Sequence, residues 1–250
     1  MHIDAATTLV RTALLPRWPD ATVAIIGGSI ARGEATPTSD IDLLLLFEHV
    51  DQAWRDTLKI GTQTVELFGH DLATFDYFCR VMDGPAGRMP LAAMVNDGVS
   101  VLPDSALLRR LRRHARKLYD AGPPPLTAEA LARQRYAITT LLEDLTDSTA
   151  PDEMLAIAVH LYGALADFAL RAAGAWSGHG RHLARRLKAT APALAADLMA
   201  GMAALATQPE VAKATFDRAV RTTLAPHGGL LLEGFMLPAP AAWRSAEVPE

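Results

Sequence analysis

The sequence changes its pattern near residue 104. Before it, short apolar runs end at glycines and prolines, which is typical of strands joined by tight turns. We predict buried strands over residues 21–26 and 41–47, a hairpin around Gly61, and an edge strand over residues 99–102. After it, apolar residues recur only at helical spacing. The sequence therefore predicts an α+β chain, with a small mixed-sheet domain over residues 1–104 and an all-helical bundle over residues 105–250.

Helical patterns also occur inside the first domain, over residues 3–15, 73–82 and 90–95. In the second domain the predicted helices cover residues 107–118, 127–147, 154–173, 181–205 and 210–224. We expect a kink or a break at Pro192, because proline cannot donate a backbone hydrogen bond inside a helix. The segment 154–173 is apolar on most sides and is expected at the centre of the bundle.

Composition excludes several classes of protein. The net charge of the 250 residues is −4, so no global field favours a long nucleic acid. The single cysteine, Cys79, excludes an internal disulfide and a cysteine-based zinc site. The N-terminus lacks the pattern of a signal peptide, and no membrane contact is expected, so we predict a cytoplasmic protein. The oligomeric state stays open, with a homodimer among the options.

A glycine-rich junction follows the first predicted strand. Gly27, Gly28 and Ser29 come directly after apolar residues and precede a short helical segment. Backbone N–H groups at such a junction form a natural seat for phosphate, and glycine lets the backbone approach it closely. The hydroxyl of Ser29 is expected to add one more hydrogen bond.

Acidic residues open the next strand. Asp40 and Asp42 are two residues apart, so their side chains point to the same face. Two such carboxylates repel unless a cation lies between them, and Mg²⁺ accepts this kind of ligand beside phosphate oxygens. Glu66 lies between two apolar residues of a later strand and becomes a third acid if the strands are neighbours. Asp71 is its rival for this place.

Gly28-Ser29, ten intervening residues and then Asp40-Ile-Asp42 resemble the signature of the polymerase-beta-like nucleotidyltransferase superfamily. The element order to residue 104 is similar to that family's minimal catalytic domain. The later helices resemble the helical domain of bacterial aminoglycoside- and lincosamide-type nucleotidyltransferases. The resemblance implies that the helical domain binds the acceptor and closes over a cleft between the domains.

The resemblance also implies a reaction. Gly28 and Ser29 would bind the triphosphate of an NTP, with ATP as the expected donor. Asp40, Asp42 and Glu66 would be the catalytic acids and the ligands of two Mg²⁺ ions. A nucleoside monophosphate would pass to a hydroxyl of a small-molecule acceptor, and pyrophosphate would leave. The alternatives are a protein or RNA-end acceptor, as in toxin–antitoxin pairs, and a nucleotide-binding or interaction protein without catalysis.

Three further groups of charged residues stand beside the glycines and acids of this motif. Arg32, Arg181 and Arg185 are candidates for contact with the nucleotide. The arginines between residues 109 and 116 surround an apolar stripe and are interpreted as a solvated helix face. An acidic cluster is a candidate site for a polycationic acceptor such as an aminoglycoside, and solvated acids explain it equally well; it consists of Glu143, Asp144, Asp147, Asp152 and Glu153.

Overall fold

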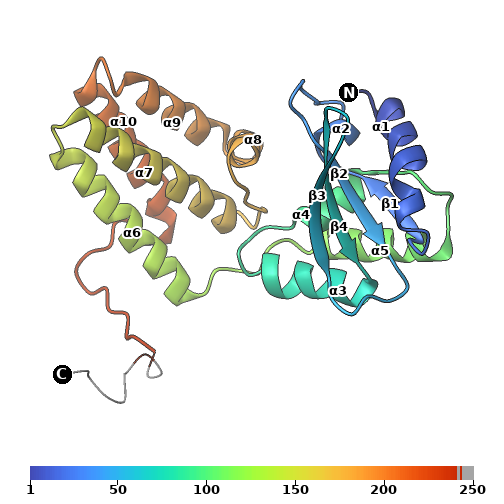
Figure 1. Ribbon diagram of the computed structural model, residues 1–250. Helices are drawn as coiled ribbons and strands as arrows, with labels where there is room; N and C mark the ends of the chain where they lie inside the picture. The colour runs from blue at the N-terminus through green and yellow to red at the C-terminus, as the bar shows by residue number, and fades with distance from the viewer. Residues whose placement is uncertain (241–242, 244–250) are drawn as a thin grey trace, which may run out of the picture. The chain divides into compact units, whose positions relative to one another are not determined.

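The computed structural model describes residues 1–240 and 243 and confirms the predicted α+β architecture. The chain forms two compact units, Met1–Pro124 and Pro125–Glu250, drawn in Figure 1. The division comes later than the predicted boundary at residue 104. The reason is that the helix α5 (Ala106–Asp120) packs against the helix α4 (Pro90–Asp97) of the sheet-bearing unit.

The N-terminal unit begins with α1 (Ile3–Leu9), which continues as a wider π-helical turn over Val10–Leu14. It also contains β1 (Val23–Ile26), α2 (Gly28–Ala31), β2 (Ile41–Leu46), β3 (Trp54–Ile60), β4 (Gln63–His70), α3 (Leu72–Tyr77) and β5 (Val99–Ser100). The predicted hairpin is β3–β4, and Gly61 in its turn has a φ of +61° that favours glycine. The predicted edge strand is β5.

The five strands lie in the order β3-β4-β2-β1-β5. β2 is the central strand, antiparallel to β1 and parallel to β4. Because alternate residues of a strand face opposite sides, Leu43 and Leu45 pack with α1 on one face while Leu44 and Leu46 are buried on the other. Burial on both faces explains the unbroken apolar run of β2. Asp42 lies on the Leu44 face, at the end of the strand where this burial stops.

The second unit is helical, as predicted. Its helices are α6 (Ala128–Asp147), α7 (Pro151–Ala172), α8 (Arg181–Thr190), α9 (Pro192–Ala204) and α10 (Pro209–Leu224). The expected break at Pro192 separates α8 from α9.

Among the described residues, α7 is the one helix whose length and composition would suit a membrane span. Its Leu161, Leu165 and Phe168 are fully buried in the core of this unit, together with side chains of α6, α9 and α10. The core helix of a helical bundle can have the same length and apolar composition as a membrane span. Burial in this core accounts for the apolar residues on that face of α7, whereas Leu155 and Val159 of the same helix are exposed.

Candidate active site

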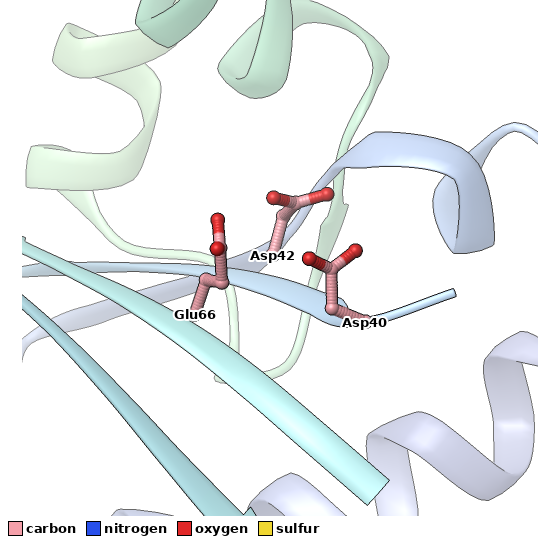
Figure 2. A group of neighbouring side chains, drawn as sticks. All are labelled: Asp40, Asp42 and Glu66. Atoms are coloured by element: carbon pink, nitrogen blue, oxygen red, sulfur yellow. The ribbon is translucent and has the colours of Figure 1, made fainter. Parts of the chain in front are cut away.

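The parallel pairing of β2 with β4 brings three acids together. Asp42 lies directly opposite Glu66 in the register, and Asp40 immediately precedes β2. Figure 2 shows the three side chains rising from the same side of the two strands and pointing toward one another. One carboxylate oxygen of each lies within 4.8 Å of the other two, and all three side chains are partly exposed to solvent. Asp40, Asp42 and Glu66 are called the carboxylate cluster below.

Gly28 is needed for this cluster in a way that the sequence did not reveal. Its φ is +64°, and a Cβ atom placed on it would lie 1.7 Å from Oδ2 of Asp42. The backbone N–H of Gly27 also donates to the carbonyl oxygen of Asp42 at 2.8 Å. The glycine junction therefore lies directly against the carboxylate of Asp42, and an added side chain would displace it.

Crowding changes the acidity of Asp42. Burial of its carboxyl group, followed by the nearby charges of Asp40 and Glu66, raises its pKa from 3.8 to about 6. The positive charges of Arg32 and Arg55 oppose this shift. The cluster thus gathers negative charge that the two arginines offset in part and that a bound cation or proton would relieve further.

The structure adds Arg55, which sequence reasoning missed. It lies on β3, and its Nη2 donates to Oε2 of Glu66 at 2.7 Å. Its guanidinium also lies 5.1 Å from the centre of the Phe68 ring. The signal was the hairpin register, because counting back from the turn at Gly61 pairs Thr57 with Glu66 and places Arg55 diagonally next to it.

The other residues predicted near the phosphates have partners within the protein. Ser29 is 2% exposed, and its hydroxyl donates to Oγ of Ser39 at 3.1 Å. Nε of Arg32 lies 3.3 Å from Oε2 of Glu34. The positive charge of Arg32 is also close enough to Asp42 to lower the pKa of that carboxyl group. Contact of Ser29 or Arg32 with a nucleotide stays a prediction.

The rival acid Asp71 is not part of the cluster. It caps α3, and its carboxylate accepts hydrogen bonds from the backbone N–H groups of Thr74, at 2.8 Å, and of Val50, at 3.1 Å. Burial alone would raise the pKa of Asp71, but these hydrogen bonds outweigh it and lower the pKa below its ordinary value. Its role is to cap the N-terminal end of α3.

Arg181 and Arg185 lie in the second unit. Both are exposed residues of α8. The members of the predicted acidic cluster are also exposed, around the turn between α6 and α7, from Glu143 to Glu153. Contact of α8 with a nucleotide and of the acidic cluster with an acceptor stay predictions.

The carboxylate cluster fits a divalent cation. Two oxygens bound to one Mg²⁺ at about 2.1 Å lie no more than about 4.2 Å apart. The observed oxygens, within 4.8 Å, need only small movements of partly exposed side chains to share an ion. Oxygen ligands from carboxylates are also the chemistry that Mg²⁺ prefers.

Comparison with known proteins gives one family. Residues 9–82, which contain the glycine junction and all three acids of the cluster, match the nucleotidyltransferase domain family. Among solved structures, the chain is similar to a nucleotidyltransferase-like protein from Exiguobacterium sibiricum 255-15, with 13% identity and a TM-score of 0.41 over 89% of this chain and 77% of that one. No curated protein matches the chain significantly.

Proposed function

We propose that the chain joins a nucleoside monophosphate from ATP to a hydroxyl of a small-molecule acceptor with the help of Mg²⁺. Its N-terminal unit carries a nucleotidyltransferase domain of the polymerase-beta-like superfamily, and the chain is therefore a nucleotidyltransferase. The observation that carries this proposal is the meeting of Asp40, Asp42 and Glu66 within 4.8 Å beside Gly28. A cytoplasmic location, where ATP is supplied, belongs to the proposal.

Each residue of the site has a part in the proposed reaction. Asp40 and Asp42 would hold the metal next to the triphosphate, and Glu66 would serve either as a third ligand or as the base. Bound Mg²⁺ supplies positive charge that neutralises the phosphates and lowers the barrier to attack. The acceptor oxygen forms a bond to the α-phosphorus, the bond from that phosphorus to the bridging oxygen breaks, and pyrophosphate leaves. Where Glu66 is not a metal ligand, it is the group that we assign to take the hydroxyl proton.

A small-molecule acceptor is supported by charge. The chain carries a net charge of −4, which disfavours a long polyanion such as RNA. The exposed acidic cluster between α6 and α7 supports acceptors that carry amino groups, such as aminoglycosides. We therefore place aminoglycosides first in an acceptor panel, with lincosamides as a less charged comparison.

The test is pyrophosphate release by the full chain. It is incubated with Mg²⁺ and ATP, GTP, CTP or UTP, with each antibiotic and with fractionated cell extract. Asp42→Asn removes a proposed metal ligand, and Asp20→Asn is the matched control because Asp20 is an exposed turn residue of the same unit. We expect acceptor-dependent release by the wild type and by Asp20→Asn, and loss of at least about a thousandfold in Asp42→Asn.

The outcomes separate the parts of the proposal. Equal release by the wild type and Asp42→Asn would refute the role of the carboxylate cluster. Nucleotide transferred to a protein or RNA fraction, with no antibiotic modified, would replace the small-molecule acceptor by the alternative class. Activity that persists in EDTA would refute the metal requirement.

A further inference from the structure

A cavity lies in the N-terminal unit, away from the carboxylate cluster. Its volume is about 820 Å³, within the range of about 300–1,000 Å³ of small-molecule sites. The walls come from the loop after β2, the start of α3 and one side of α5, with Phe47 and Leu107 among the apolar residues. We call this cavity the α5 pocket.

One wall of the α5 pocket is a row of cations. Arg110, Arg113 and Lys117 are spaced by three and four residues, so they lie on one face of α5 and all line the cavity. All three side chains are exposed, and no ion pair is found for any of them within residues 1–240 and 243. Part of the arginine-rich helix face that the sequence indicated as solvated therefore also lines a cavity.

Three acids also line the pocket, but they come from the loop after β2 and from the start of α3, whereas the α5 wall holds cations and no acid. Asp71 is held by the hydrogen bonds that cap α3, and Oδ1 of Asp76 lies 2.8 Å from Nε2 of His114. Both carboxylates thus have partners of their own. Glu48 is the third acid that lines the pocket, and its side chain is exposed in the loop after β2. These hydrogen bonds hold Asp71 and Asp76 in place but leave their negative charges, so the positive charge of the pocket is concentrated along its α5 wall.

The pocket and the carboxylate cluster lie at opposite ends of β2. Phe47 lines the pocket and Asp42 belongs to the cluster, five residues apart on an extended strand, which corresponds to about 16 Å. In Figure 1, α2 and α3 mark these two ends of the sheet. A triphosphate beside Gly28 therefore does not fill the pocket.

We propose that the α5 pocket is a binding site for a phosphorylated small molecule, separate from the site of nucleotidyl transfer. Guanidinium groups bind phosphate through paired hydrogen bonds, and lysine adds a third charge. The volume exceeds the need of a phosphate alone, and Phe47 and Leu107 offer apolar surface to the rest of the ligand. This inference does not depend on the proposed acceptor or on catalysis.

The test measures binding of two probes, inorganic pyrophosphate and AMP, to the full chain by calorimetry in EDTA, so that no metal links them to the carboxylate cluster. The pocket variant carries Arg110→Gln, Arg113→Gln and Lys117→Gln. The matched control carries Arg109→Gln, Arg112→Gln and Arg116→Gln, which remove three cations from the same helix at positions that do not line the pocket. Melting curves check that both variants fold, and single variants Arg113→Gln and Arg112→Gln repeat the comparison.

We expect the wild type to bind at least one probe and the pocket variant to bind it at least about tenfold more weakly, since hydrogen bonds to charged groups are lost. The control should stay within about threefold of the wild type. Equal weakening in both variants would show a general attraction to a basic helix and overturn the proposal. Binding that survives in the pocket variant, or no binding of either probe to the wild type, would overturn it as well.

Discussion

Replacing Asp42 by asparagine should abolish activity and at the same time stabilise the metal-free protein. Asn has nearly the shape of Asp but no charge. The substitution therefore removes the repulsion by Asp40 and Glu66 and the burial of an ionised group, which together raise the pKa of Asp42 to about 6. A purely structural acid would behave in the opposite way, because losing it would cost stability.

The magnitude follows from the shift in pKa. A rise from 3.8 to about 6 corresponds to about 3 kcal/mol of unfavourable free energy when Asp42 is ionised in the folded state. Its side chain is partly exposed, and solvent screening reduces this to about 1–2 kcal/mol. For a unit of this size, that gain raises the midpoint of thermal unfolding by about 4–8 °C.

The assay is thermal unfolding in EDTA at several pH values. The folded pKa of Asp42 lies above its unfolded value, so protonation stabilises the fold. The stability of the wild type should fall as pH rises from about 4 through about 6 relative to Asp42→Asn. The gap between the two proteins should be full at pH 7 and vanish near pH 4. Mg²⁺ should then stabilise the wild type and leave the variant unchanged.

Asp20→Asn serves as the control and should match the wild type at every pH, because Asp20 is an exposed turn residue. If Asp42→Asn melted at or below the temperature of the wild type at pH 7 in EDTA, the three carboxylates would not be crowded as described here. The case for a shared cation would then lose its electrostatic basis.

Three further changes test the neighbours of the cluster. Gly28→Ala should reduce Mg²⁺ affinity and activity at least about tenfold, whereas Gly33→Ala, at a similar φ of +70° with open space around it, should cost only about 1 kcal/mol of stability in thermal unfolding. Asp71→Ala should retain transfer activity but lose about 1–2 kcal/mol of stability at pH 7. This loss should shrink in acid, because the pKa of Asp71 is lowered in the folded state. Full loss of activity with an unchanged unfolding temperature would contradict the capping role. Arg55→Ala should bind Mg²⁺ a few-fold more tightly in a titration followed by unfolding temperature, because the guanidinium competes for Oε2 of Glu66, and weaker binding would instead show that it positions the carboxylate.

Local pattern was enough to find most of the elements. The apolar run before Gly27, the turn at Gly61 and the break at Pro192 each depend on neighbours in the chain, and the structure has them where they were expected. The boundary between the units was predicted at residue 104 and lies at residue 124. Helical spacing predicts an apolar stripe on α5, but it does not predict that α5 packs against α4 and so belongs to the first unit.

Residue types and their local spacing were enough to predict the chemistry of the site, namely a glycine that permits close approach and carboxylates two residues apart at the start of a strand. The choice of Glu66 over Asp71 depended on the parallel register of β2 with β4, and this pairing joins residues too far apart for any periodicity to fix. Arg55 and the α5 pocket likewise arise from elements brought together by packing. The physical reason is that side-chain periodicity is local, whereas the distances that set charge, acidity and binding depend on strand register and helix packing.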